Sequence, residues 1–258
     1  MIIFNKIKLF LVISLSIFLL NSCGFGDKPE PRLSLFIGVD ISGSFIKGPY
    51  FNDSINFLAH YIYAHLNGLG GLEVPSVMFV GSIGGAKKNE PKTFHFMQQF
   101  ENKSIEEIKA ELKIIFPKNV SNPFTDFNAF FEQIAMTVQE RNLILKPISI
   151  VMISDGIPDV KNEVTQKPDF RSLNFKPLEL LSRNITVRLL YTDAVVGRSW
   201  KTDIPRKRVK VWTQDATAMV SWKDASTLDP NKPFEEQDRF FRWIKDQVDF
   251  GVRSQRIN

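Results

Sequence analysis

Five oxygen-bearing side chains in three separate segments have the types and the spacing of a cation site. They are Asp40, Ser42, Ser44, Thr125 and Asp155. The first three follow the apolar run at residues 33–39, Asp155 follows a second apolar run at residues 148–153, and Thr125 stands between the two runs. Carboxylate and hydroxyl oxygens are hard ligands that suit Mg²⁺, Mn²⁺ or Ca²⁺ and do not suit Zn²⁺ or Cu²⁺. The set therefore predicts a divalent-cation site, with Mg²⁺ as the preferred ion and Mn²⁺ or Ca²⁺ as alternatives.

The mixture of hydroxyls and carboxylates predicts how such an ion would behave. Neutral hydroxyls that bind it directly leave most of its charge uncompensated, and carboxylates behind bridging waters would hold it without quenching that charge. Mg²⁺ takes six ligands, so a protein that supplies fewer leaves a position for water or for a carboxylate from outside. The expected partner is a protein with an exposed Asp or Glu.

The elements that must position these residues alternate between strands and helices. Apolar runs predict strands at residues 33–39, 74–80, 92–97, 148–153, 185–191 and 209–212. Helical spacing predicts helices at residues 51–66, at 105–115 behind a capping box of Ser104 and Glu107, from near Thr125, at 178–183, and around Phe240, Phe241, Ile244 and Val248. No helix is evident in residues 193–206, although a crossover is needed there. The alternation predicts an α/β fold, a doubly wound and mostly parallel sheet with helices on both faces. In such sheets ligands bind at the carboxyl ends of the strands, where the five candidates fall.

The order Asp40-x-Ser42-x-Ser44, then Thr125, then Asp155 resembles the metal-ion-dependent adhesion site of von Willebrand factor type A (VWA) domains. The resemblance covers about residues 33–251. It implies that Ser42, Ser44 and Thr125 touch the metal directly or through water, while Asp40 and Asp155 act largely through water. It also implies that an acidic side chain of a ligand often completes the metal shell.

The N-terminal segment predicts export and anchoring. Residues 1–8 hold two Lys and no acid, and residues 9–20 carry no charge. A helix of twelve residues reaches only about 18 Å, short of a bilayer core. Leu20-Asn21-Ser22-Cys23 resembles the bacterial lipobox, which implies cleavage before Cys23 and its acylation; an ordinary signal peptide with an incidental Cys is the alternative. We expect a signal peptide at 1–22, a lipidated Cys and tether at 23–32, a VWA-like domain at 33–251 and a tail at 252–258. Gly24 in place of Asp favours the outer membrane of the cell envelope.

Composition excludes several classes of protein. The single Cys excludes a disulfide framework and a Cys-rich zinc module. The net charge of +5 falls to +3 once Lys6 and Lys8 are removed with the signal, which is too small an excess to indicate nucleic-acid binding. The three histidines are expected to be structural. They are His60, His65 and His95.

Less specific interpretations stand beside these predictions. Ser42 and Ser44 could form a polar turn and Asp155 could cap a loop. We expect Asp126 to lie at a helix N-terminus, where the helix dipole favours its negative charge, and Asp159 to cap a loop. Neither residue is expected to bind the metal. The basic cluster at residues 206–210 predicts a solvated strand edge, with contact to anionic lipid or an acidic partner as the alternative.

The sequence therefore predicts a lipid-anchored extracytoplasmic binding domain and not an enzyme. One alternative is a structural subunit of an envelope assembly or secretion complex. Another is a metal-dependent phosphoesterase using the same loops, which would need a nucleophile or general base beside the metal. No histidine lies near the three segments, and Ser42 stands where haloacid-dehalogenase-like enzymes carry a second Asp.

Overall fold

The computed structural model describes residues 30–87, 89–119 and 122–251, and the described residues from Arg32 onward form one compact unit. The signal peptide and Cys23 lie outside the described residues, as do most of the tether and residues 252–258. A six-stranded sheet has the strand order β4-β2-β1-β6-β7-β8. Its strands are β1 (Ser34–Val39), β2 (Val77–Ser82), β4 (Phe94–Phe96), β6 (Ile148–Ile153), β7 (Ile185–Thr192) and β8 (Lys210–Asp215). Only β4 runs antiparallel to its neighbour, which confirms the predicted mostly parallel α/β sheet.

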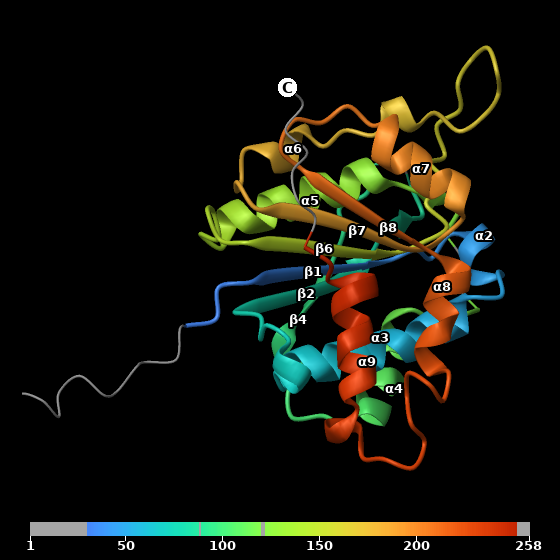
Figure 1. The fold of residues 1–258 in the computed structure, drawn as a ribbon. Coiled ribbons are helices and arrows are strands. Elements are labelled where there is room, and N and C mark those ends of the chain that lie inside the picture. The colour runs from blue at the N-terminus through green and yellow to red at the C-terminus, as the bar shows by residue number, and fades with distance from the viewer. Residues whose placement is uncertain (1–29, 88, 120–121, 252–258) are drawn as a thin grey trace, which may run out of the picture. The chain divides into compact units, whose positions relative to one another are not determined.

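Helices cover both faces of the sheet (Figure 1). One face carries α3 (Phe51–Leu66), α4 (Ile105–Ile115), α8 (Ala216–Val220) and α9 (Asp238–Trp243). The other carries α5 (Phe127–Glu140), α6 (Lys176–Glu179) and α7 (Ala194–Thr202). No helix in the described part of the chain is both long and apolar enough to span a membrane.

The central strands are buried because both of their faces meet a helical layer. All six residues of β1 are buried. Alternate residues point to opposite faces, so Leu35 and Ile37 join the core beneath α3 and α4, whereas Phe36 joins the core beneath α5. This two-sided burial explains why the strand is a continuous apolar run with little alternation.

The structure corrects the expectation for residues 193–206, where it forms helix α7. Asp193 caps this helix by accepting a hydrogen bond from the Val195 N–H at 2.7 Å. Gly197 lowers the intrinsic helix propensity. A Cβ at this glycine would lie 2.9 Å from Thr213 Oγ1, so its small size lets α7 pack closely on β8. Tertiary packing outweighs a weak local signal here.

Several predicted boundaries shift by a few residues. The helix expected from near Thr125 begins at Phe127, because Thr125 belongs to the two-residue strand β5 (Phe124–Thr125), which pairs with β3 (Gly84–Gly85). The strand expected at 74–80 is Val77–Ser82, and the one expected at 92–97 is Phe94–Phe96. The strand expected at 209–212 is Lys210–Asp215, and the helix expected at 178–183 is Lys176–Glu179. The helices expected at 51–66 and 105–115 are confirmed, including the capping box of the second.

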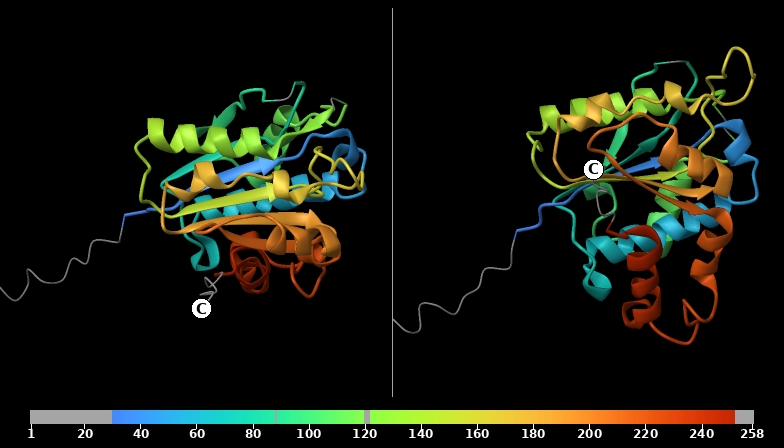
Figure 2. Two further views of the ribbon diagram at one scale, coloured as in Figure 1. Left: turned by 90° about the horizontal axis from the view of Figure 1, so that it is seen from above. Right: turned by 45° about the horizontal axis from the view of Figure 1, so that its top comes forward.

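The parallel strands give the sheet two distinct edges. The five parallel strands all begin at one edge, which we call the amino edge, and end at the other, the carboxyl edge (Figure 2). Helices α2 (Gly43–Ile46), α7 and α8 all begin at the carboxyl edge, because they follow β1, β7 and β8 directly (Figure 1).

Candidate metal centre

Asp40 lies at the carboxyl edge and joins two loops. Its side chain is fully buried. The backbone N–H of Ser42 donates to its Oδ1 at 2.8 Å, and the hydroxyl of Ser154 donates to its Oδ2 at 2.6 Å. Its own N–H donates to Ile153 O at 2.8 Å. Asp40 therefore fixes the loop after β1 against the loop after β6.

The Asp40 carboxylate is held by neutral donors. Burial raises its pKa to about 6, although the hydrogen bonds from Ser154 and Ser42 oppose this rise, and the charge of nearby Asp155 adds to it. No cationic side chain among the described residues contributes to this pKa. A divalent cation near Asp40 and Asp155 would stabilise both carboxylates, so the charge of the site fits such an ion.

Ser42 and Ser44 lie at the start of α2. Their hydroxyl oxygens are 3.1 Å apart, and Ser42 is buried while Ser44 is exposed. Adjacent ligands of an octahedral Mg²⁺ with bonds of about 2.1 Å are separated by about 3 Å. The two hydroxyls thus have a spacing that fits two positions of one shell, at the boundary between the protein interior and solvent.

The Asp155 backbone is fixed while its side chain is partly exposed. Gly156 has φ +77°, and a Cβ there would lie 2.6 Å from Leu189 Cδ2, so the loop requires glycine. Trp200 Nε1 donates to Gly156 O at 2.7 Å, and the Thr192 hydroxyl donates to Asp155 O at 2.8 Å. The Asp155 carboxylate accepts the N–H of Ile157 with Oδ1 at 3.0 Å.

Thr125 reaches the site through the backbone. Asn122, in the same segment, donates its N–H to Ile41 O at 2.9 Å and forms a bridge with Ser42. The N–H of Thr125 donates to Asp159 Oδ2 at 2.5 Å. In the described part of the chain, no hydrogen bond joins the Thr125 hydroxyl to the other four candidates. Hydrogen bonds thus connect Asp40, Ser42 and Ser44, and the charge of nearby Asp155 acts on Asp40. Thr125 lies in β5, whose segment is bridged to Ser42.

Of two nearby acids, Asp126 has the helix role expected of it, whereas the Asp159 carboxylate bonds to the backbone of β5 instead of to its own loop. Asp126 caps α5 by accepting the N–H of Ala129 at 3.0 Å. Asp159 anchors Thr125, as described above. Sequence reasoning missed the role of Ser154, whose hydroxyl links Asp40 to the N–H of Gly156 at 2.9 Å. The available signal was a hydroxyl directly after a buried strand, one residue before the predicted ligand Asp155.

A pocket of about 440 Å³ opens beside these residues. Its lining includes Ser44, Asp155, Tyr50, Tyr191, Asp193 and Asp215. Tyr191 has φ +69° at a register shift between β7 and β8, a conformation that costs free energy for a bulky residue. Its hydroxyl donates to Asp53 at 2.8 Å and so secures this conformation. The pocket leaves open space next to Ser44 and Asp155.

Carboxylates and histidines alone do not define a metal site here. Among the described residues, no three His, Cys, Asp or Glu side chains are grouped so that they could hold a metal ion. The candidate set contains only two carboxylates, so its capacity for a cation depends on the hydroxyls of Ser42, Ser44 and Thr125.

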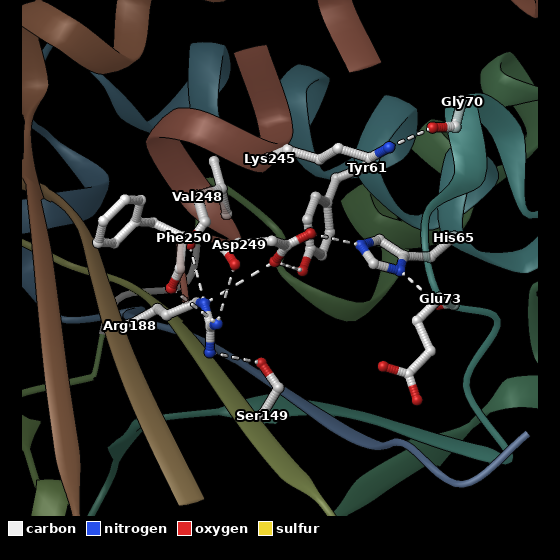
Figure 3. Close-up of polar contacts among 10 residues, drawn as sticks. All are labelled: Tyr61, His65, Gly70, Glu73, Ser149, Arg188, Lys245, Val248, Asp249 and Phe250. Atoms are coloured by element: carbon white, nitrogen blue, oxygen red, sulfur yellow. Dashed lines mark hydrogen bonds and ion pairs between the residues drawn. The ribbon is translucent and has the colours of Figure 1, made fainter. Parts of the chain in front are cut away.

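A second buried polar cluster, the C-terminal network, consists of Tyr61, His65, Ser149, Arg188 and Asp249 (Figure 3). His65 Nε2 lies 2.9 Å from Asp249 Oδ2, and the Tyr61 hydroxyl donates to Asp249 Oδ1 at 2.9 Å. Arg188 Nε lies 3.8 Å from the same Oδ1, and its guanidinium also donates to Ser149 Oγ at 3.0 Å. The network fastens the segment after α9 to α3 and β7, which is a structural role for His65.

The two other histidines also make local contacts. His60 Nδ1 lies 2.8 Å from Asn56 O, and His95 Nδ1 lies 3.0 Å from Gln99 Oε1. The contacts of all three histidines fit the structural roles expected of them.

Comparisons with known proteins give similarity of fold. Neither a protein-family model nor a curated protein matches the sequence. Similar solved structures include manganese-loaded TRAP protein from Plasmodium vivax, with 15% identity over 74% of this chain and 71% of that chain and a TM-score of 0.42. Proximal thread matrix protein 1 from the mussel byssus has 14% identity over 74% of this chain and 45% of that chain, with a TM-score of 0.41. The SpRpn10 VWA domain has 12% identity over 75% of this chain and 96% of that chain, with a TM-score of 0.41. At these values the similarity concerns the fold alone.

Proposed function

We propose that this chain is a lipid-anchored VWA-like domain that binds a protein partner through a divalent cation. The observation that carries the proposal is the state of Asp40. Its buried carboxylate connects the loops after β1 and β6, has neutral donors, and lies near a second carboxylate, Asp155. A buried charge without a counterion is costly. A bound cation would remove that cost and would explain why an acid occupies this position.

The roles of the residues follow from their chemistry and their exposure. Ser42, Ser44 and Thr125 would offer hydroxyl oxygens to the ion, and Asp40 and Asp155 would hold it through water. When bound, Mg²⁺, or alternatively Mn²⁺ or Ca²⁺, supplies a positive charge that attracts an anionic oxygen. The chain's own task is to orient the hydroxyls and to leave one side of the ion open.

The recognised group on the partner would be an exposed Asp or Glu. The pocket beside Ser44 and Asp155 gives the residues flanking that acid a place to pack. We further propose that acylated Cys23 anchors the domain in the bacterial cell envelope, with the outer membrane favoured, and that its role is adhesion or complex assembly without catalysis.

The proposal is tested with the ion first. Calorimetric titration of the full acylated chain with Mg²⁺ and Mn²⁺ is expected to show binding, and Asp40→Ala should weaken it by at least about tenfold, since one tenfold step is about 1.4 kcal/mol. The matched control is Asp224→Ala, which changes an exposed acid on another loop and should leave ion binding unaltered. Wild-type and Asp40→Ala proteins should share the same far-UV circular dichroism. Equal ion binding by both would contradict the proposal.

The partner is tested by cross-linking and capture from native membranes with and without a chelator. We expect the chelator and Asp40→Ala to abolish capture, while Asp224→Ala retains it. A complex that survives the chelator would instead indicate a structural subunit of an envelope assembly. Mg²⁺-dependent turnover of a generic phosphoester that is lost in Asp40→Asn would indicate a phosphoesterase.

A further inference from the structure

Three neighbouring loops at the amino edge are rich in basic residues and contain one acidic residue, Asp203. They are residues 141–147 before β6, 180–184 before β7 and 203–210 from the end of α7 into β8. Their basic residues are Arg141, Lys146, Arg183, Arg206, Lys207, Arg208 and Lys210. Glu179, the last residue of α6, borders the loops and accepts the N–H of Lys207 with Oε1 at 2.6 Å. The loops touch one another: the Leu145 N–H donates to Leu181 O at 2.9 Å, and Lys210 Nζ donates to Asn184 Oδ1 at 3.3 Å. We call this surface the amino-edge patch.

Two leucines of the amino-edge patch are unusually exposed. Leu145 is 73% exposed and Leu180 is 85% exposed. Leu145 also has φ +71°, an uncommon conformation for a leucine, and its N–H is bonded to the loop that carries Leu180. Single exposed leucines are ordinary, but two on bonded loops among cations have the composition of surfaces that lie in a lipid headgroup layer.

The chain that leads to the lipidation motif arrives at this same edge. The Ser34 N–H, at the start of β1, donates to Pro147 O at 2.9 Å, so β1 begins directly beside the loop of residues 141–147. Only residues 24–32 separate Cys23 from Leu33, the residue before β1. Nine residues span at most about 30 Å. An acylated Cys23 would therefore keep the amino edge within reach of the membrane surface.

We propose that the amino-edge patch docks onto an anionic lipid surface. Leu145 and Leu180 enter the headgroup layer, and the exposed side chains of Arg183, Lys207 and Arg208 contact lipid phosphates. The Arg206 guanidinium instead donates to backbone carbonyls at the end of α7. The carboxyl edge lies at the opposite end of the parallel strands (Figure 1). Asp40, which follows β1 at that edge, then faces away from the membrane, toward the partner. The proposal takes the anchor at Cys23 from the proposed function and does not depend on the bound cation.

The chain provides a direct test, because its only Cys would be acylated. Leu145→Cys and Leu180→Cys then each add a single reactive thiol for an environment-sensitive fluorophore. The matched control is Val195→Cys, since Val195 is 69% exposed and belongs to α7 at the carboxyl edge. The full acylated chains are reconstituted in phosphatidylcholine vesicles with and without phosphatidylglycerol.

We expect a blue shift and a rise in fluorescence at residues 145 and 180 in the anionic vesicles, reversed by high salt, and no change at residue 195. Lys207→Glu with Arg208→Glu should abolish the shift while the protein stays anchored; both side chains are exposed, so the fold should tolerate the change. No shift at either leucine position, or an equal shift at residue 195, would overturn the proposal. Binding of a soluble acidic polypeptide or of RNA to the patch, without a shift in vesicles, would also overturn it.

Failure of the anchor is recognised separately. If Cys23 is not acylated, the wild-type chain itself takes up the fluorophore and does not remain with neutral vesicles. Sedimentation of that unanchored protein with the anionic vesicles then decides the docking proposal: binding that Lys207→Glu with Arg208→Glu abolishes supports it, and absence of binding overturns it.

Discussion

Asp40 and Asp249 are two largely buried carboxylates that the fold treats in opposite ways. Burial raises the pKa of Asp249, but His65 and Arg188 outweigh it and hold that pKa below its usual value. Burial likewise raises the pKa of Asp40, and its hydrogen-bonding partners are neutral, so that pKa stays at about 6. The chain thus supplies cations for one buried acid and neutral groups for the other.

The difference distinguishes Asp249, which has a structural role, from Asp40, whose charge is available to a cation from outside the protein. In the C-terminal network the attraction is mutual, since Asp249 also raises the pKa of His65 although burial alone would lower it. At the carboxyl edge the described structure places Asp155, a second negative charge, near Asp40. An arrangement that is unfavourable for the protein alone becomes favourable once a cation is shared.

The largest expected effect on stability comes from replacing Asp249, the acid whose charge is compensated by His65 and Arg188. Asp249→Ala leaves Arg188 and His65 without their counterion, so the free energy of unfolding should fall by about 3–5 kcal/mol. Urea denaturation followed by circular dichroism measures it. The control Asp246→Ala removes an exposed acid three residues earlier and should change stability by no more than about 0.5 kcal/mol. Equal losses for the two variants would contradict the contrast.

Replacing Asp40 is expected to raise the free energy of unfolding, the opposite of the effect at Asp249, when a chelator is present. A pKa of about 6 in place of 3.8 makes the ionised side chain unfavourable by up to about 3 kcal/mol at neutral pH. Asp40→Asn removes the charge and can keep both hydrogen bonds, because the Ser154 hydroxyl can also accept. We expect the variant to be more stable than wild type by about 1–2 kcal/mol at neutral pH.

The pH dependence sharpens this test. The protonated form of Asp40 stabilises the fold fully below pH 3.8, and this contribution is lost as the pH rises through about 6. The gap between Asp40→Asn and wild type should therefore shrink as the pH falls from about 7 to about 4.5. Urea unfolding in chelator at both pH values measures the gap. A variant less stable than wild type at neutral pH would show that Asp40 is already compensated within the protein.

The smallest expected effect lies at the edge of the C-terminal network. Tyr61→Phe removes one hydrogen bond to Asp249, whose two cationic neighbours remain, and should cost about 1 kcal/mol. Tyr63→Phe removes a bond of the same length to Glu235 on the surface and should cost less than about 0.5 kcal/mol. Thermal unfolding of both proteins compares them, and an equal cost would mean that burial does not strengthen the bond.

Local patterns predicted the elements whose signals are strong. The apolar run at 148–153, the helical spacing at 51–66 and the capping box of Ser104 and Glu107 all correspond to observed elements. Helix α7 was missed because Gly197 weakens its local preference, and its stability comes from packing against β8. The local pattern predicts a helix start near Thr125, whereas Thr125 pairs with Gly84 in a short strand. A local pattern does not reveal this pairing, because the two residues are about forty positions apart in the sequence.

The sequence by itself determined the chemistry that the carboxyl edge can offer: two carboxylates and three hydroxyls that follow apolar runs, with no imidazole or thiolate among them. The tertiary structure alone decided which acid is neutralised, because the partners of Asp249 come from α3 and β7, and His65 is 184 residues away in sequence. Strand register and helix packing bring such groups together, and no local pattern records them. The same long-range contacts leave Asp40 among neutral donors, so that its charge is left for a cation from outside the chain.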